Sequence, residues 1–482
     1  MAISANTAWE VRPTNGNDAN GGGFVAGATG TDWSQQNFPQ YSVNDGVANG
    51  TTTITSASAT FGTDVPGNLI YVQGGTGTIT AGWYQIVSRT NSTTIVVDRS
   101  TGLTAGTGVT LHIGGALKTL AQAAAIYAAS NKIFAKGEAI QTTTAGVTFS
   151  TGATPSATAP MTRIIGYTSV RGDGGQFTLK LLTNAGLIGI QPSGAGISLE
   201  NITVDCNSLG TSEGFGAGNF GRLVNCIVKN FTLVGINTGS TQFLVHGCEV
   251  TGGTSAASEA VLLQAAETYM QFCNIHDNAC TGVKISGTGP SVRHCLIANN
   301  TGASSDGIQV SAGNSLVIEG NTIYGSGRDG IRWAVANTPI IATVVNDNIL
   351  ASNGGWGMNS TTAAFAADPV WDGNVYYNNT SGTRNNMDDT GGTNAINGVS
   401  PYTNTLDIVI TNGSPFTNAA GGDFTLNNTT LRGALIRGHG VPATLPNATG
   451  TSYPDMGVFQ HQDPASGGIN RAAYPSGVSS VG

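Results

Sequence analysis

The chain has 482 residues, with 70 glycines, 10% charged side chains, 39% hydrophobic residues and a formal net charge of −8. A negatively charged chain does not offer the basic surface that binds nucleic-acid backbones, and no stretch approaches the roughly 18 apolar residues of a membrane-spanning helix. A disordered chain would be more charged and less apolar. The composition therefore predicts a folded, glycine-rich protein with no nucleic-acid partner and no membrane span.

Residues 1–112 alternate between apolar and polar side chains in the manner of β-strands. The clearest segments are TTTITSASATF (51–61), NLIYVQGG (68–75), GWYQIVSR (82–89) and TTIVVDRS (93–100). They predict a small antiparallel β domain that protects an otherwise open strand edge in the next domain. The first residues lack the basic and apolar runs of a secretory signal peptide, so we expect the protein to fold in the cytosol.

A short helix is predicted next, over residues 117–130 (LKTLAQAAAIYAAS), which combine strong helix formers with nearly helical spacing of apolar residues. We expect this helix to close the N-terminal end of the following core. Strand-like segments then occupy residues 132–140, 162–175, 177–183, 186–192 and 197–207.

One pattern then returns about every 22 to 27 residues between 219 and 379. Alignment of the repeats gives an apolar column of Val228, Val250, Ile275, Ile297, Ile323, Leu350 and Tyr376. Two residues earlier stand Cys226, Cys248, Cys273 and Cys295, followed in the same register by Asn321, Asn348 and Asn374. Each unit is too short for a 10-residue helix and rich in Val, Ile and Thr, so each repeat is read as one turn of stacked short strands. The predicted fold is all-β, a right-handed parallel β-helix spanning residues 113–380.

A polar strip accompanies a second column of glycines and apolar residues. Glu259, Thr281, Asp306 and Asp329 stand just before this column, and Lys284, Gln309, Arg332 and Asn359 stand two residues after it. Carboxylates on neighbouring turns, close to an arginine, suit glycan binding, polysaccharide hydrolysis or Ca²⁺-assisted lyase chemistry. The alternative is that each Asp-Gly pair only forms a turn into a strand.

The candidate glycan-binding residues are Glu259, Asp306, Asp329, Arg332, Trp333 and Trp356. The two tryptophans would stack on sugar rings if they were exposed, and packing in the core is the alternative for each. No residue is assigned a catalytic role, because no nucleophile elbow, phosphate-binding loop or zinc-protease motif is present.

The cysteines are predicted to be free and buried, because four of the six share one column and the chain is expected to fold in a reducing compartment. His246, His276 and His294 lie near this column, but there is no C-x-x-C pair and His294 should face away from Cys295. We therefore expect neither a metal site nor a cofactor. The asparagines of the column are read as a stacked amide ladder.

Residues 381–482 are predicted to form an irregular or β-rich cap and a tail, because the apolar columns fade and several prolines interrupt any strand pairing. The last stretch, residues 462–482, is low in complexity. We expect it to be an extended arm that is either held by a partner or poorly ordered.

Several segments resemble pectate-lyase-like β-helix proteins, and together they span most of residues 115–460. These segments are ALKTLAQAAAI with KIFAKGEAI, RIIGYTSVRGDGG, DFTLNNTTLRGALIRGHGVP and YPDMGVFQ. The N-terminal segments FGTDVPGNLIYVQGG and GWYQIVSRTNSTTIVVDRSTG resemble modules that are fused to β-helices in phage virion proteins.

This resemblance implies a protein on the surface of a virion, of tailspike, fibre or head-decoration type, made in the host cytoplasm. It also implies a homotrimer that contacts other virion proteins and a host-surface polysaccharide. The leading interpretation is a non-enzymatic structural protein, and the alternative is a polysaccharide depolymerase on the same scaffold. A bacterial adhesin is disfavoured because a signal peptide is not evident.

Overall fold

A computed structural model describes residues 3–102, 104–157, 159–183, 186–216, 218–239, 241–256, 258–334, 343–361, 370–385, 407–438 and 455–458. The chain divides into two compact units, residues 1–180 with 190–203, and residues 181–189 with 204–482. Regular structure in the described part is almost entirely β, as the sequence predicts. None of the helices in this part is long and apolar enough to cross a membrane.

The first unit contains a closed antiparallel barrel with the strand order β3-β4-β7-β6-β5-β8. Its strands are β3 (Tyr41–Ala48), β4 (Thr53–Thr55), β5 (Leu69–Gln73), β6 (Gly82–Asn91), β7 (Thr94–Val97) and β8 (Gly106–Ile113). The predicted antiparallel β domain is confirmed, although β3 and β8 were not predicted because Gly, Asn, Asp and Thr interrupt their apolar alternation. Ile54, Ile95 and Leu111 are fully buried in the barrel core.

The first unit also holds parallel coils, which begin with an N-terminal strand. The strand order is β2 (Gly23–Val25), β1 (Thr7–Val11), β9 (Lys132–Lys136), β12 (Thr162–Tyr167) and β15 (Ile197–Glu200). Strand β1 pairs in parallel with β9, so residues 7–11 are part of the coil and not of the barrel. Strands β10 (Gln141–Thr143) and β11 (Val147–Phe149) complete the early coils, and β13 (Phe177–Leu181), β14 (Ile188–Pro192) and β16 (Ile202–Asp205) lie at the sequence boundaries of the two units.

The predicted helix is present as α1 (Leu120–Ile126), which is shorter than residues 117–130. The Thr119 side chain caps it by accepting a hydrogen bond from the backbone N–H of Gln122. Leu120 and Ala123 are its buried residues, so one apolar face packs on the coil while the opposite face stays outside.

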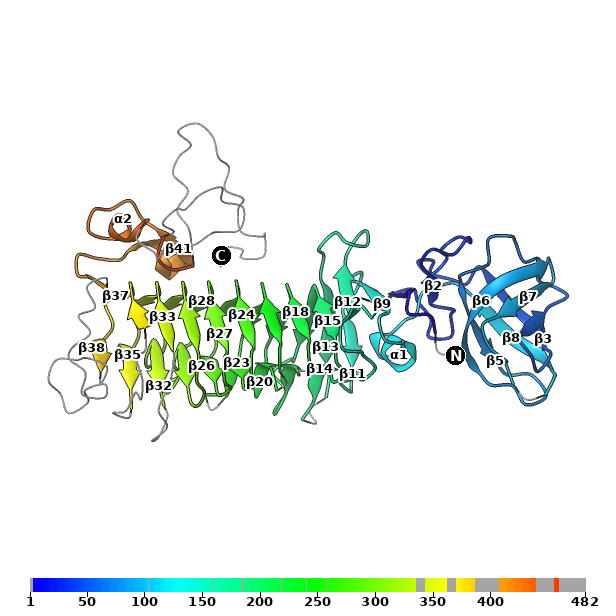
Figure 1. Cartoon of the computed structure of the whole chain (residues 1–482), viewed down its shortest axis with the longest axis horizontal. Coiled ribbons are helices and arrows are strands. Elements are labelled where there is room, and N and C mark those ends of the chain that lie inside the picture. Colours follow the sequence, from blue (N-terminus) through cyan, green and yellow to red (C-terminus); the bar gives the residue numbers. More distant parts are fainter. Residues whose placement is uncertain are drawn as a thin grey trace, which may run out of the picture. The chain divides into compact units, whose positions relative to one another are not determined.

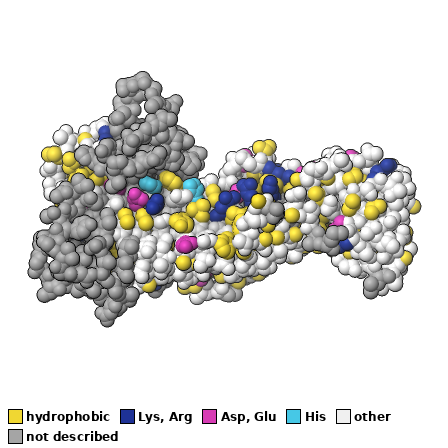
Figure 2. Space-filling model, in the orientation of Figure 1, with side chains coloured by type: hydrophobic (Ala, Val, Ile, Leu, Met, Phe, Trp, Pro, Cys, Tyr) yellow, Lys and Arg dark blue, Asp and Glu magenta, His cyan; other side chains and the backbone are white. Residues whose placement is uncertain are grey.

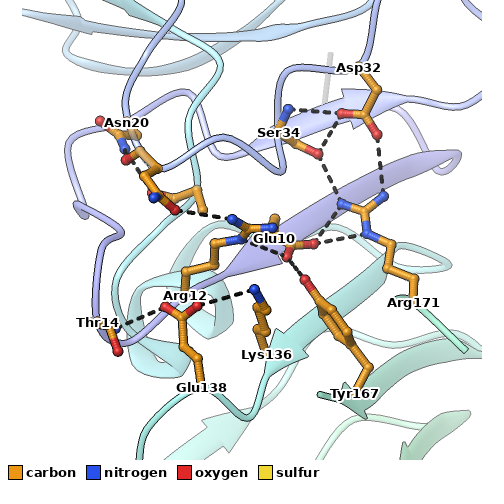
Figure 3. Close-up of polar contacts among 12 residues, drawn as sticks. Glu10, Arg12, Thr14, Asn20, Asp32, Ser34, Lys136, Glu138, Tyr167 and Arg171 are labelled. Atoms are coloured by element: carbon orange, nitrogen blue, oxygen red, sulfur yellow. Dashed lines mark hydrogen bonds and ion pairs between the residues drawn. The ribbon is translucent and has the colours of Figure 1, made fainter. Parts of the chain in front are cut away.

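A buried ion network joins β1 to the β12 coil within the first unit (Figure 3). Glu10 on β1 is fully buried and binds Arg171 at 2.7 Å and Arg12 at 3.3 Å, and the Tyr167 hydroxyl donates to the same carboxylate. Burial raises the pKa of Glu10, while Arg171 and the Tyr167 hydrogen bond oppose that rise. Arg171 also reaches Asp32 at 3.3 Å, so the network ties three separate segments together.

The second unit is a stack of coils, and each coil contributes one short strand to each of three parallel sheets (Figure 1). The first sheet contains β18 (Arg222–Val224), β21 (Leu244–His246), β24 (Tyr269–Gln271), β27 (Ser291–Arg293), β30 (Val317–Glu319), β33 (Val344–Asn346) and β36 (Val370–Asp372). The second contains β19 (Ile227–Lys229), β22 (Glu249–Thr251), β25 (Asn274–His276), β28 (Leu296–Ala298), β31 (Thr322–Tyr324), β34 (Ile349–Ala351), β37 (Val375–Tyr377) and β39 (Ile408–Ile410). The third contains β17 (Glu213–Phe215), β20 (Val234–Asn237), β23 (Glu259–Leu263), β26 (Thr281–Ile285), β29 (Ile308–Val310), β32 (Ile331–Trp333), β35 (Trp356–Ser360) and β38 (Gly382–Asn385). This architecture is the right-handed parallel β-helix that the sequence predicts.

The predicted apolar column is confirmed residue by residue in the second sheet. Its pairs run Val228↔Val250, Val250↔Ile275, Ile275↔Ile297, Ile297↔Ile323, Ile323↔Leu350 and Leu350↔Tyr376. All of these side chains are buried, because alternate residues of a strand point to the same face. The six cysteines are likewise buried and none of them forms a disulfide, as predicted, and burial raises the pKa of Cys206 and of Cys280 to about 12.

Two columns of left-handed residues bend each coil of the second unit. The first column precedes the second sheet and contains Asn225, Gly247, Phe272, His294, Gly320, Asp347 and Gly373, all with φ between 51° and 66°. The other follows the same sheet and contains Asn230, Gly252, Asp277, Asn299, Gly325, Ser352 and Asn378, with φ between 51° and 70°. Gly, Asn and Asp dominate both columns because they enter this region at the lowest cost.

Amide ladders stabilise the inside of these bends. The Oδ1 of Asn348 accepts from the backbone N–H and from the Nδ2 of Asn321, at 3.1 and 2.9 Å, and the Nδ2 of Asn348 donates to Asn374 at 3.0 Å. The predicted ladder is therefore present. A second ladder, which the sequence analysis did not identify, includes the 2.9 Å bond from Asn278 to Asn300 and the 2.8 Å bond from Asn353 to Asn379.

The described C-terminal residues cover one side of the coil stack. They form strands β40 (Phe416–Asn418) and β41 (Asp423–Leu426), the 3-10 helix η1 (Ala419–Gly421) and the helix α2 (Gly433–Ile436). Phe416, Phe424, Leu426, Ile436, Met456 and Val458 pack on outward side chains of the second sheet, including Leu296, Ala298, Ile349, Ala351 and Val375. The predicted arm at residues 462–482 lies outside the described residues.

Candidate functional site

The predicted polar strip lies on the outer face of the third sheet. Strand pairing places Glu259 beside Thr281 in one outward column, and it places Lys284, Gln309, Arg332 and Asn359 side by side in the other. Residues between these columns, such as Val283 and Ile308, point inward and are fully buried. The register of the strip is therefore that of the sequence alignment.

Asp306 and Asp329 are not open to the outside, contrary to the glycan-binding role that the sequence suggested for them. Their exposed fractions are 0% and 1%. Asp306 forms a bidentate ion pair with Arg328 at 2.7 and 2.6 Å, and burial raises its pKa while Arg328 opposes that rise. Asp329 accepts from the Trp356 backbone N–H at 2.8 Å. Both carboxylates therefore hold the start of strands in place, which is the turn role considered as the alternative.

The glycine after each aspartate has a packing reason. A Cβ atom on Gly307 would lie 2.3 Å from Cγ2 of Ile323, which is far inside van der Waals contact. In each Asp-Gly pair of the strip, the carboxylate thus binds the next coil, and the absence of a Cβ atom at the glycine leaves room for the core side chains.

The two tryptophans have different environments. Trp333 is 1% exposed and belongs to the core, so it cannot stack on a sugar at the surface. Trp356 is half-buried on the outer face of β35. Of the two proposed stacking platforms, only Trp356 keeps an accessible ring.

The accessible groups of the strip form one outward column, and its members differ in whether their side chains already have a partner within the protein. Lys284 binds Glu259 at 2.6 Å, Gln309 donates to Asp306 at 3.2 Å, and Asn359 donates to Asp329 at 2.7 Å. Arg332 stands between Gln309 and Asn359; its buried Nε has no hydrogen-bond partner among the described residues, and its charge helps to oppose the rise in the pKa of Asp306. A half-buried arginine that retains its donors can bind an anionic or hydroxyl-rich ligand.

A second candidate site lies on the second sheet, where the C-terminal residues meet the coils. A cavity of about 310 Å³ is lined there by His276, Asp277, Leu296, Ala298, Asn299, Ala420, Gly421, Gly422 and Phe424. The sequence analysis did not find it, because residues 420–424 lie more than a hundred residues beyond the repeats that they cover. The only local signal was the His-Asp-Asn run at the bend after β25.

His276 is held between two carboxylates beside this cavity. Its Nδ1 lies 2.8 Å from Asp277 and its Nε2 lies 3.2 Å from Glu249. Burial alone would lower the pKa of His276, but the hydrogen bonds to Glu249 and Asp277 outweigh burial and raise it. The imidazolium form is thus favoured at the wall of the cavity.

Replacing His276 by Gln is expected to cost stability that depends on pH. A histidine whose folded pKa is raised contributes fully below its unfolded pKa of about 6.5, and the contribution disappears as pH rises through the folded value. The difference in the free energy of unfolding between wild type and His276→Gln, measured by urea titration, should therefore be constant below about pH 6.5 and shrink as pH rises above it. The same titration with Glu249→Gln should show a weaker pH dependence, and a difference that grows with pH would contradict this assignment.

Comparison with known proteins supports the fold. Residues 234–412 match the family model described as a right handed beta helix region. No curated protein matches the chain. The solved structures similar to it include the pectate lyase Pel9A, with a TM-score of 0.49 at 14% identity, covering 72% of this chain and 92% of that chain.

Two further solved structures are similar to parts of the chain. Geobacillus virus E2 ORF18 has a TM-score of 0.37 at 12% identity over 53% of this chain and 52% of that chain. The mannuronan C-5 epimerase AlgE4 A-module of Azotobacter vinelandii has a TM-score of 0.36 at 11% identity over 52% of this chain and 67% of that chain. The strand register and the family match both define a right-handed parallel β-helix.

Proposed function

We propose that this chain is a structural protein of a phage virion surface, of tailspike, fibre or head-decoration type, which binds a host-surface glycan along the outer face of its third sheet. The observation that carries the glycan assignment is the column of Lys284, Gln309, Arg332 and Asn359, one polar side chain on each successive strand. Because neighbouring strands lie about 4.8 Å apart, a linear polymer laid along this column meets a donor at every coil.

A binding role fits this strip better than hydrolysis. Glycoside hydrolysis requires two carboxyl groups that reach the scissile bond from either side. Asp306 and Asp329 are buried and already occupied by Arg328 and by the Trp356 backbone. Among the more accessible residues of the strip, Lys284, Gln309, Arg332 and Asn359 all carry hydrogen-bond donors, which suit recognition.

The virion assignment is supported by the N-terminal segments that resemble phage virion modules, and these segments fold into the closed barrel β3–β8. We propose that other virion proteins bind this part and that the chain assembles as a homotrimer. On the described part of the face in Figure 2, charged side chains are sparse apart from one cluster of Lys and Arg, as expected for surfaces that pack against copies of the chain. Light scattering should then give about three times the chain mass of 48.8 kDa.

The glycan assignment predicts that Arg332→Gln weakens binding to a bacterial surface polysaccharide about 10-fold or more, because hydrogen bonds to charged groups contribute about 1.5–3 kcal/mol. Gln309 occupies the equivalent position one coil earlier, so the substitution should not disturb folding. Binding would be measured by biolayer interferometry against a panel of purified lipopolysaccharides and capsular polysaccharides.

Arg293→Gln is the matched control. It makes the same change on the first sheet, and Gln271 holds the equivalent position one coil earlier. Equal losses in both variants, or no polysaccharide bound by the wild type, would overturn the assignment of this strip. If the wild type shortened a polysaccharide while it bound, the depolymerase alternative would replace the binding role.

A further inference from the structure

The outward-facing residues of the second sheet change from polar to apolar along the stack. The outward residues of β22 and β25 are polar, namely Glu249, Thr251, Asn274 and His276. From β28 onward most of them are apolar, including Leu296, Ala298, Ile349, Ala351 and Val375, and the C-terminal residues bury them. The boundary between a polar wall and an apolar floor therefore falls between β25 and β28.

The cavity of about 310 Å³ lies at this boundary. Leu296 and Ala298 provide its apolar floor, and Phe424 closes the apolar side. The Phe424 ring is fixed in place by Tyr324 and Phe416, whose ring centroids lie 5.1 and 5.4 Å away. This volume is at the lower end of the range of about 300–1,000 Å³ for small-molecule sites, so the cavity suits a ligand of one small ring.

The polar wall offers acceptors and donors in close proximity. The Asp277 side chain is 47% exposed, and its two oxygens are bound to His276 at 2.8 Å and to Asn299 at 3.2 Å. An ionised carboxylate has about four lone-pair positions, so Asp277 can accept further hydrogen bonds from a ligand. Asp277 and Asn299 are consecutive members of the second left-handed column, which aims both side chains outward beside the cavity.

The charges at the wall exclude an anionic ligand. Glu249 and Asp277 flank the single cation His276, so an incoming anion would meet a net negative group. A purely apolar ligand would cover Asp277 and displace the water that it binds, but would offer no hydrogen bond in return. Burying a carboxylate in this way is costly. A ligand with one apolar face and neighbouring hydroxyl groups meets neither penalty.

From this geometry we propose that the cavity binds one neutral sugar ring, with its apolar face on Leu296, Ala298 and Phe424 and two hydroxyl groups on Asp277 and Asn299. The site is separate from the strip on the third sheet, and it does not depend on the function proposed for that strip. It would give the lateral surface of the coil stack a second glycan-binding site, and this site would hold a single sugar unit.

The test uses saturation-transfer NMR on the full chain with D-glucose, D-galactose, D-mannose and N-acetyl-D-glucosamine, each added separately at millimolar concentration. Wild type is expected to transfer saturation to at least one of these sugars. Ala420→Trp should abolish the signal, because Ala420 is exposed at the rim and a large ring there fills the cavity without disturbing the core. Asn299→Ala should weaken binding about three- to tenfold, the loss expected for one neutral hydrogen bond.

Asn378→Ala is the control for Asn299→Ala, because both asparagines are in the same left-handed column, with φ of 51° and 55°, and Asn378 does not line the cavity. Its signal should equal that of the wild type, and thermal unfolding would verify that all variants fold. The proposal is overturned if none of the four sugars gives a signal, or if Ala420→Trp retains it. Loss of the signal in Arg332→Gln would place the sugar on the third sheet and would equally overturn it.

Discussion

Glu10→Gln is expected to lower the free energy of unfolding of the first unit by about 3 kcal/mol, because removal of one partner from a buried ion network leaves the other charges uncompensated. Glu10 is fully buried, and its carboxylate is the common partner of Arg12, Tyr167 and Arg171. The amide keeps the shape of the side chain but cannot neutralise two guanidinium groups. Urea unfolding followed by tryptophan fluorescence would report the change, since Trp9 is buried on the same strand.

Glu138→Gln is the control for this change. Glu138 lies in the same region (Figure 3) and pairs with Lys136 at 3.4 Å, but both side chains are partly exposed. Exposed pairs contribute about 0–1 kcal/mol, so this variant should remain close to the wild type. If the two variants lost the same stability, the Glu10 network would not be the element that holds β1 on the coil.

Asn348→Ala is expected to destabilise the second unit by about 4 kcal/mol. The substitution removes bonding partners from the backbone N–H of Asn321, from the Asn321 side chain and from the carbonyl of Ile318, all of which are buried. Each buried polar group left without a partner costs about 1–3 kcal/mol. Thermal and urea unfolding of the variant would measure the loss.

The matched variant is Cys248→Ala, at the same column position four coils earlier. The Cys248 thiol donates to the His246 carbonyl at 3.5 Å and contacts the thiols of Cys226 and Cys273 in the same column, so its removal costs a small cavity and weak sulfur hydrogen bonds but no strong one. We expect a loss of about 1 kcal/mol. Comparable losses for Asn348→Ala and Cys248→Ala would mean that shape, and not the amide chain, stabilises this column.

The register of the coils could be predicted from the sequence because each side chain of a short strand has only two possible faces. A shift of one residue would turn Val250 or Ile323 outward, so the apolar column specifies the pairing by itself. The same argument predicted that Lys284, Gln309 and Arg332 share an outward column.

Exposure could not be predicted in the same way. Asp306 and Trp356 occupy the same column of the third sheet two coils apart, yet Asp306 is fully buried because Arg328 of the next coil covers it, whereas Trp356 is only half-buried. The cover comes from the next coil and not from the residues beside Asp306 in the sequence. For the same reason the cavity near Asp277 could not be foreseen, since its roof is supplied by residues without any repeat.

The amide ladder has a direction, and that direction limits how the stack can end. From Cys295 onward, the backbone N–H of each column member donates to the side-chain oxygen of the next, at 2.9 Å to Asn321 and 3.1 Å to Asn348 and Asn374. The final acceptor is Asp407, at 2.8 Å from the Asn374 N–H, and Asp407 also binds Arg384 at 2.5 Å. The side chain of an interior member both accepts and donates, which an amide can do and an ionised carboxylate cannot, whereas the side chain of the last member only accepts. The carboxylate of Asp407 therefore ends the ladder. It accepts the last hydrogen bond in the row, and it has no donor with which to continue the row into another coil or another molecule.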